Sequence, residues 1–222
     1  MANWRKSLRL SEIFSSIQGE GIYVGYRQIF LRFSGCNMDC DYCDENAGEG
    51  QFYDIPEVLE RVRELGKNYH HSVSLTGGEP LLQINDMLKL LPEIDLPKYL
   101  ETNATLPAHL KEIRAMIDIF SMDFKPGFEK EFQESLELVR EDDAFVKFIQ
   151  ISGTFINDLR KAVDIVSLVN KDIPFIIQPV TPHKLIKHMP TGDEIIAAYQ
   201  IAKRKLSDVR VIPQTHKILR LK

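Results

Sequence analysis

A regular alternation of short apolar runs with segments of helical period constrains the fold most strongly. The runs are rich in β-branched and aromatic residues, and the segments between them carry the spacing of amphipathic helices. The runs of strand character are Gln28–Phe33, Ser72–Thr76, Lys98–Thr102, Met116–Met122, Ala144–Gln150 and Pro174–Gln178, followed by a last extended run at Asp208–Ile212. Strands that alternate with helices join by right-handed crossovers into a mainly parallel sheet. The sequence therefore predicts an α/β fold with about six mainly parallel strands and outer helices.

Helix starts are expected where proline or a capping residue precedes an amphipathic segment. These positions are Pro56, Gln83, Pro107, Glu129, Thr154 and Thr191. The 222 residues show no internal repeat or linker, so we expect one domain spanning residues 1–222.

Charge and hydropathy limit the classes of partner. The 28 basic and 32 acidic residues are well mixed and give a net charge of −4, which argues against direct binding of nucleic acid. The amino-terminal stretch MANWRKSLRLSEIF lacks the apolar run of a secretory signal, and no stretch approaches the roughly 18 apolar residues that span a bilayer. We expect a cytoplasmic protein without a membrane partner.

Polar clusters follow the predicted strands. The first strand runs into the cysteine loop, and the second, third, fourth and sixth end in TGGEP, ETN, SMDFK and QPVT. In parallel sheets the functional loops gather at the carboxyl ends of the strands. These clusters are therefore expected to face one mouth.

All three cysteines lie in SGCNMDCDYCDE with the spacing CxxxCxxC. An odd, clustered set in a cytoplasmic chain is not typical of disulfides. A structural zinc site needs a fourth ligand, for which His70 and His71 are candidates, but both precede the second strand and are expected at the opposite end of the sheet. A four-iron cubane takes one thiolate per iron, so three thiolates leave one iron open to another ligand. Zinc and an iron–sulfur cluster both remain as interpretations at this point.

The cysteine spacing together with TGGEP resembles the signature of the radical S-adenosylmethionine (SAM) superfamily. The resemblance implies a partial (β/α) barrel open on one side, with a [4Fe-4S] cluster on Cys36, Cys40 and Cys43 and SAM on the open iron. The glycines allow close approach of backbone to a ligand. By position, Gly77, Gly78 and Glu79 would contact SAM.

Three further motifs, SIQGEG, RFSGCNMDCDYCD and PQTHK, resemble the 7-carboxy-7-deazaguanine synthase family, and the resemblance spans nearly the whole chain. It implies conversion of 6-carboxy-5,6,7,8-tetrahydropterin to 7-carboxy-7-deazaguanine and ammonia, a lyase step toward the 7-deazapurines queuosine and archaeosine of modified tRNA. The residues that it places at the substrate are Ile17, Gln18, Gly19, Glu20, Arg32, Thr76, His216 and Lys222. The segments 1–27 and 207–222 would both lie on the substrate side.

The resemblance also places two later segments at the cofactor. Their residues are Ser121, Asp123, Lys125, Gln178, Pro179, Val180 and Thr181. The segment SMDFKP is longer than the usual Ser-Pro-Lys of the family, so the correspondence within it is open. The family carries Thr or Ser two residues after the third cysteine as a Mg²⁺ ligand, and this chain has Glu45 there. A carboxylate is a good ligand for a hard cation, so Mg²⁺ at Glu45 is expected, although loss of the metal site is the alternative.

The resemblance further implies a homodimer and a reductant such as flavodoxin or ferredoxin. Two other functions are considered. ETNATLP and SMDFK resemble elements of enzymes that activate glycyl-radical enzymes, and the cysteine cluster alone would also suit a zinc-binding structural or interaction module.

Overall fold

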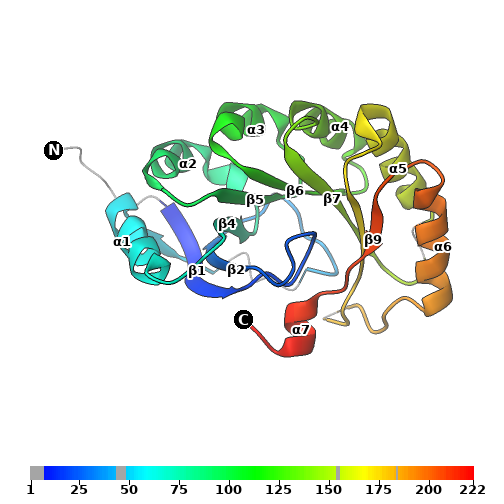
Figure 1. The fold of residues 1–222 in the computed structure, drawn as a ribbon, viewed down its shortest axis with the longest axis horizontal. Helices are drawn as coiled ribbons and strands as arrows, with labels where there is room; N and C mark the ends of the chain where they lie inside the picture. Colours follow the sequence, from blue (N-terminus) through cyan, green and yellow to red (C-terminus); the bar gives the residue numbers. More distant parts are fainter. Residues whose placement is uncertain (1–7, 44–48, 154–155, 184) are drawn as a thin grey trace.

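The computed structural model describes residues 8–43, 49–153, 156–183 and 185–222, and it contains one curved sheet of nine strands (Figure 1). Every neighbouring pair from β2 to β9 is parallel, whereas β1 pairs antiparallel with both β2 and β3. The spatial order is β3-β1-β2-β4-β5-β6-β7-β8-β9, so β3 and β9 are edge strands and the sheet is open. The strands are β1 Leu8–Ile17, β2 Arg27–Phe33, β3 Gln51–Tyr53, β4 Ser72–Gly77, β5 Lys98–Thr102, β6 Ile119–Asp123, β7 Asp143–Gln150, β8 Phe175–Pro179 and β9 Val209–Val211.

In the part of the chain that the structure describes, helices α1 to α6 cover the outer side of the sheet, and α7 lies on the opposite side near the C-terminal end (Figure 1). The α-helices are α1 Ile55–Gly66, α2 Ile84–Leu90, α3 Pro107–Ile113, α4 Glu129–Leu138, α5 Ile156–Asn170, α6 Gly192–Lys203 and α7 Thr215–Leu219. The 3₁₀ helices are η1 Pro80–Gln83, η2 Leu91–Glu93 and η3 Arg114–Met116. Capping boxes begin α1 and α6: the side chains of Asp54 and Thr191 each accept a hydrogen bond from the backbone of a glutamate three residues later, and that glutamate reciprocates.

Alternation along the strands divides the interior into two apolar layers. In β7, Ala144, Val146 and Phe148 pack into the large core between sheet and helices, whereas Phe145 belongs to a second cluster on the concave side. That second cluster consists of Tyr99, Ile119, Phe145 and Ile176, with Ile22, Tyr23 and Ile212 packed against it. We call these residues the apolar floor. Its four buried members lie nearer the amino ends of their strands than the polar residues that follow them by two positions, which are Glu101, Ser121, Lys147 and Gln178. The apolar floor therefore closes the interior from the side of the amino ends.

The prediction of an open, mainly parallel α/β barrel is confirmed, and each predicted strand is present. Strand β6 begins later than the predicted Met116, because η3 occupies Arg114–Met116. The pattern did not predict β1, β3 or α7. Residues 18–26 between β1 and β2 form a long loop without the two-residue turn that marks a hairpin in sequence, so the pattern indicates only an N-terminal extension where β1 lies.

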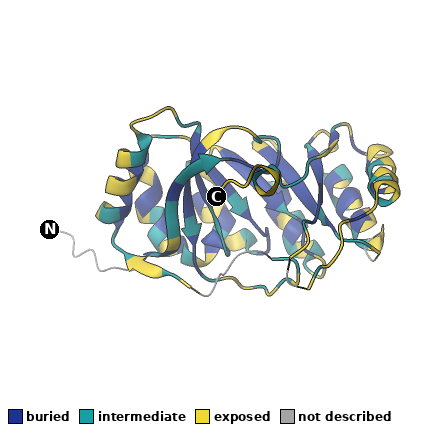
Figure 2. Ribbon diagram, turned by 90° about the horizontal axis from the view of Figure 1, so that it is seen from below, coloured by how far each residue is buried: buried dark blue, intermediate teal, exposed yellow. Residues whose placement is uncertain are grey.

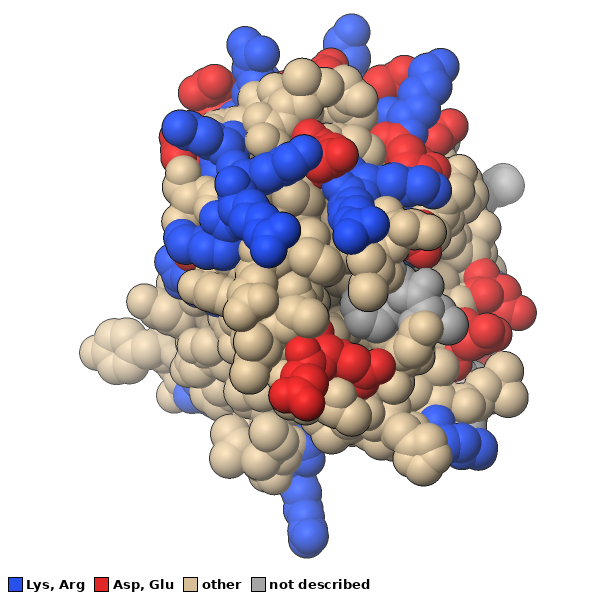
Figure 3. All heavy atoms as spheres, turned by 90° about the vertical axis from the view of Figure 1, so that its right-hand side faces the viewer, with Lys and Arg blue, Asp and Glu red and all other residues tan. Residues whose placement is uncertain are grey.

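The outer surface is polar and mixed in charge. Figure 2 shows buried strands flanked by helices whose outward sides are exposed. Figure 3 shows Lys and Arg side chains gathered on part of the side where α6 lies, with Asp and Glu among them. Exposed ion pairs such as Lys205–Asp164 (2.6 Å) and Lys161–Glu129 (2.8 Å) neutralise part of this charge. None of the described helices is long and apolar enough to cross a membrane.

Candidate active site

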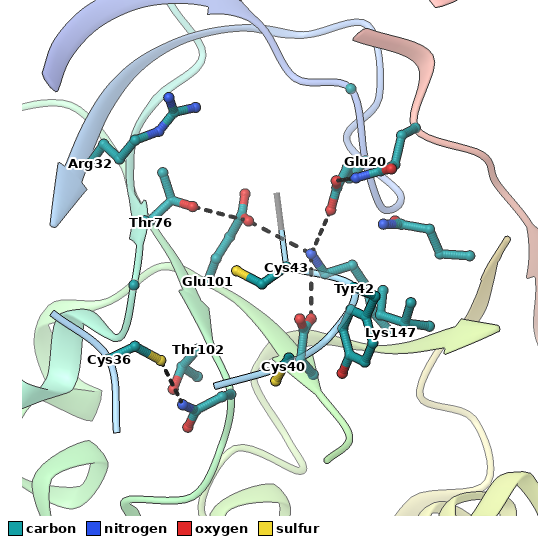
Figure 4. Close-up of a pocket in the computed structure, with 18 of the residues that line it drawn as sticks. Glu20, Arg32, Cys36, Cys40, Tyr42, Cys43, Thr76, Glu101, Thr102 and Lys147 are labelled. Carbon is teal, nitrogen blue, oxygen red and sulfur yellow. Dashed lines mark hydrogen bonds and ion pairs between the residues drawn. The ribbon is translucent and has the colours of Figure 1, made fainter. Parts of the chain in front are cut away.

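Side chains at the carboxyl ends of β2 and β4 to β8 surround one cavity of about 430 Å³ (Figure 4). The β1–β2 loop and the segment after β9 complete its wall. A volume of this size suits a small organic ligand. The expectation that polar strand ends share one mouth is confirmed for the described residues. Among the residues expected at the site, those that line the cavity are Ile17, Gln18, Gly19, Glu20, Arg32, Cys36, Cys40, Cys43, Thr76, Gly77, Gly78, Asp123, Lys125, Gln178, Val180, His216 and Lys222.

The three thiols all border this cavity on the loop that follows β2. Cys36 is exposed and Cys40 and Cys43 are partly buried, and a backbone hydrogen bond of 2.9 Å from Cys43 to Cys40 folds the loop. Tyr42 lies between the last two cysteines, and its hydroxyl accepts a hydrogen bond of 3.2 Å from Lys125 Nζ. The ammonium also lies 5.2 Å from the centre of the Tyr42 ring. These contacts tie the cysteine loop to the end of β6.

His70 and His71 occupy the other end of the sheet, as expected. His70 is hydrogen-bonded to Ser15 at 2.8 Å, and the ring of His71 packs on Tyr23 and Tyr26. Both histidines precede β4, whereas the cysteine loop follows the parallel β2. Neither histidine therefore lies where it could complete a zinc site with the three thiols.

Gly77 brings β4 close to the end of β2. Its φ is +113°, and a Cβ at this position would lie 2.4 Å from the carbonyl oxygen of Phe33 and 2.6 Å from its nitrogen. Only glycine fits both the conformation and the space. The following Gly78 donates its N–H to the Phe33 carbonyl at 2.9 Å. The turn therefore presents bare backbone beside the thiols.

Glu79 has a different position from the one expected of a cofactor contact. It is fully buried and does not line the cavity. Its carboxyl group accepts hydrogen bonds from Leu81 N–H (3.0 Å), Asn103 N–H (2.8 Å) and the Thr102 hydroxyl (2.9 Å). Burial, which outweighs these hydrogen bonds, raises the pKa of Glu79 to about 7. Glu79 joins the ends of β4 and β5 beneath the site.

The QGEG loop is held to the strand ends by side-chain amides. Gln18 Nε2 donates to Glu101 Oε1 at 2.9 Å and to Gln28 Oε1 at 3.0 Å. The Thr76 hydroxyl donates to the other oxygen of Glu101 at 3.2 Å. Gln18, which is expected at the substrate from the sequence, is thus oriented by Glu101. Sequence reasoning did not single out Glu101.

The C-terminal segment packs directly on the same loop. A Cβ on Gly19 would lie 2.2 Å from Nδ1 of His216 and 2.6 Å from its Cβ, so the absence of a side chain lets the imidazole approach. Thr215 donates its N–H to the Gly19 carbonyl at 2.9 Å, and Gln214 Nε2 donates to Glu20 Oε1 at 2.8 Å. The motifs QGEG and PQTHK, which are almost 200 residues apart, form one wall of the cavity.

Two cations meet an aromatic ring near Glu12. Arg32 lies 5.0 Å and the Lys222 ammonium 5.3 Å from the centre of the Phe14 ring. Arg32 forms an ion pair of 3.3 Å with Glu12, and Lys222 also pairs with that carboxylate. Arg32 and Lys222 both line the cavity, so this corner offers positive charge to a carboxylate ligand.

Sequence reasoning missed Lys147, which lies at the centre of the site. Its ammonium contacts Glu20 at 2.8 Å, Asp123 at 3.3 Å and Glu101 at 3.6 Å. Burial on its own would raise the pKa of Glu20, but Lys147 and Gln214 together lower it to about 2. Burial raises the pKa of Glu101. The positive charge of Lys147 opposes this rise, and the negative charge of Glu20 adds to it. The available signal was a lysine inside the otherwise apolar stretch AFVKFI.

The donor set around the cavity fits a cluster with SAM. Three soft thiol ligands border one cavity, and the backbone of the Gly77–Gly78 turn lines the same cavity. Gln178 lines the cavity, and its Oε1 is buried without a hydrogen-bond partner among the described residues, so it has capacity for a bound donor. Cys36, Cys40 and Cys43 would hold the cluster, and Gly77, Gly78 and Gln178 line the same cavity.

The remaining expected residues lie elsewhere. Ser121, Pro179 and Thr181 do not line the cavity, and Ser121 is fully buried. Glu45 and the expected helix start at Thr154 lie outside the described residues. Tyr42, Glu101 and Gln214 were not expected at the site but line the cavity.

Comparison with known proteins agrees with this geometry. A family model described as the Radical SAM superfamily matches residues 31–130. Fold and three-thiol cavity together define a radical SAM enzyme, whose cofactors are a [4Fe-4S] cluster and SAM. The 7-carboxy-7-deazaguanine synthase of Geobacter sulfurreducens is 36% identical, with 95% of this chain and 96% of that protein covered. The enzyme of that name from Methanothermobacter thermautotrophicus is 33% identical over the same shares. The chain belongs to the 7-carboxy-7-deazaguanine synthase family.

A solved structure supports the fold independently. QueE from Escherichia coli superposes with a TM-score of 0.64 over 93% of each chain, at 18% identity. The family assignment favours the synthase over the two other functions considered, the activating enzyme and the zinc-binding module.

Proposed function

We propose that the protein converts 6-carboxy-5,6,7,8-tetrahydropterin to 7-carboxy-7-deazaguanine and ammonia. The supporting observation is that three distant segments, the QGEG loop, the TGGEP turn and the segment PQTHK, border one cavity together with the three thiols. Two relatives that are each covered over 96% of their length carry the name of this activity.

The cavity offers matching groups to each part of this substrate. The Gln18 amide and the Glu101 carboxyl group provide a donor and an acceptor for the pterin edge, and they hold each other in place at 2.9 Å. Arg32 would bind the substrate carboxylate in exchange for Glu12, and a planar guanidinium is suited to that pairing. Thr76, Gly19 and His216 border the same space.

The cofactor half lies on the side of the thiols. When bound, the cluster and SAM supply a 5′-deoxyadenosyl radical. The chain's part is to orient the substrate toward it and to exclude water, for which the apolar floor closes the interior from below. We place Asp123, Lys125, Val180 and Gln178 on this side, with Ser121, Glu79, Pro179 and Thr181 as supporting residues.

Anaerobic reconstitution tests the activity directly. The protein is loaded with iron and sulfide, reduced, and incubated with SAM and the carboxytetrahydropterin, and 7-carboxy-7-deazaguanine is detected by its mass. Cys36→Ala, which removes one iron ligand, serves as the matched inactive control. Turnover only in the presence of a partner protein, or a colourless protein that holds one zinc ion, would contradict the proposal.

Mg²⁺ completes the proposed site through Glu45. Carboxylate oxygens suit this cation, and the substrate carboxylate would share it. Glu45→Thr should shift the Mg²⁺ concentration that gives half-maximal rate. An unchanged metal response would remove Glu45 from the site.

The remaining expectations concern organisation and partners. We propose a single cytoplasmic domain of residues 1–222 that functions as a homodimer, with segments 1–27 and 207–222 on the substrate side and flavodoxin or ferredoxin as reductant. Sedimentation equilibrium gives the oligomeric state. Reduction kinetics with each protein identify the reductant.

A further inference from the structure

Lys147 is a buried cation at the cavity wall. It lies in the middle of β7, its side chain is 4% exposed, and its ammonium points to the centre of the site (Figure 4). The residue directly across the parallel pairing is Asp123 on β6. An unpaired lysine is costly in such a position, so its partners determine what it does.

The three partners come from three separate parts of the chain. Glu20 lies on the β1–β2 loop, Glu101 near the end of β5 and Asp123 at the end of β6. Their contacts with the ammonium measure 2.8, 3.6 and 3.3 Å. Burial disfavours the charged lysine, but Asp123, Glu20 and Glu101 outweigh it and raise the pKa of Lys147 well above its usual value. The ammonium is therefore charged at neutral pH.

Each carboxylate continues the network in a different direction. Glu20 accepts a hydrogen bond from Gln214 on the C-terminal segment at 2.8 Å. Glu101 accepts from Gln18 of the QGEG loop at 2.9 Å. Asp123 pairs with Lys125 at 3.4 Å, and Lys125 contacts Tyr42 between the cysteines. One cation is thus linked to both halves of the cavity.

We infer that Lys147 is a positioning residue: its ammonium serves as a fixed internal cation that orients Glu20 and Glu101 toward the substrate and Asp123 toward the cofactor. This inference rests on the proposed function for the identity of the substrate, but the geometry of the network does not depend on it. Lys147 acts through these carboxylates and need not touch the substrate itself.

A purely structural role would not require charge at this position. The preceding residue on the same face of β7, Phe145, belongs to the apolar floor, and buried ion clusters are often replaceable by apolar side chains without loss of stability. Lys147 borders the cavity, where three carboxylates would otherwise repel one another in a poorly solvated space. The cation is placed where it controls the geometry and charge of the site.

Three variants of the cluster-loaded enzyme test this role. Lys147→Met keeps the chain length and removes the charge, Lys147→Arg keeps the charge, and Lys205→Met removes a lysine paired with Asp164 on the exposed outer surface. Hydrogen exchange is measured on each, without substrate, in the β1–β2 loop and the C-terminal segment. We expect Lys147→Met to raise exchange at least tenfold in these two regions and less than twofold in the central strands, with most protection regained in Lys147→Arg.

The pH dependence of kcat/KM for the pterin gives a second measurement that a structural role would not change. The titratable and charged groups around Lys147 are Glu20, Glu101, Asp123 and Tyr99, with Lys125 beside Asp123 and His216 beside Glu20. Loss of the cation makes the carboxylates harder to ionise, so the acidic limb of the profile should move at least one pH unit higher in Lys147→Met. Lys147→Arg and Lys205→Met should keep the wild-type limb.

The outcomes separate this inference from the proposed function. A uniform rise in exchange, an unchanged acidic limb, or the same changes in Lys205→Met would overturn the role of Lys147. If Lys147→Met does not fold, Glu20→Gln is measured in its place. Hydrogen exchange equal to that of the wild type in the β1–β2 loop and the C-terminal segment of Glu20→Gln would then refute the positioning role of Lys147. A wild-type enzyme that forms no carboxydeazaguanine would refute the proposed function and leave the exchange result valid.

Discussion

Replacing Gly77 with alanine should destabilise the protein through two separable effects. The residue has φ +113°, a conformation that costs a side-chain-bearing residue about 1–3 kcal/mol. The added Cβ would also meet backbone atoms of Phe33 at 2.4 and 2.6 Å, which cannot rotate away. Overpacking of this kind costs about 1–3 kcal/mol, so the free energy of unfolding should fall by about 2–6 kcal/mol in total.

Gly127→Ala provides the matched control. Gly127 has φ +88° but nothing within 4 Å of the added Cβ, so its substitution carries the conformational cost alone, about 1–3 kcal/mol. Urea unfolding of both variants, followed anaerobically at constant cluster content, gives the difference. We also expect SAM affinity to fall in Gly77→Ala and to stay unchanged in Gly127→Ala. Equal urea midpoints for the two variants would refute the argument that β4 approaches β2 too closely for a side chain.

Three further predictions concern charge and fit. The folded Glu79 carboxyl group, with a pKa of about 7 against an ordinary 4.5, keeps its proton where the unfolded chain has lost it. The stabilising contribution of this proton is therefore present below about pH 4.5 and is lost as pH rises through 7, by at most about 1.4 kcal/mol per pH unit. Glu79→Gln should therefore weaken the pH dependence of the urea midpoint between pH 5 and 8. Parallel pH profiles for the wild type and the variant would contradict this. Gly19→Ala should displace His216 and raise the KM for the pterin about 10- to 100-fold without weakening SAM, whereas the control Gly192→Ala, with open space around its Cβ, should not. Arg32→Lys should raise the same KM at least about tenfold, because an ammonium cannot pair bidentately with a carboxylate; an unaltered KM would place the carboxylate elsewhere.

The sequence predicted the part of the site that depends on local order. Strands alternating with helices imply which strand ends point the same way, so the sequence alone places the cysteine loop and TGGEP at one mouth. The pairings that depend on register could not be predicted this way. Lys147 opposite Asp123, and His216 against Gly19, result from packing between segments far apart in the chain. β1 is not evident from the sequence for a related reason, since its partner β2 follows a long loop that lacks the two-residue turn of a hairpin.

Polarity changes abruptly along the inward-facing side of the sheet, and this change connects stability with function. On β7 and β5, Phe145 and Tyr99 belong to the apolar floor, and Lys147 and Glu101 follow two residues later. The floor contributes to folding by burying apolar surface, and it also removes water from beneath the charged groups. Charges that face a dry surface interact more strongly than charges in water, so Lys147 fixes its carboxylates more firmly than a surface lysine such as Lys205 fixes its partner. The apolar layer is therefore one reason why the site above it has a defined geometry before substrate binds.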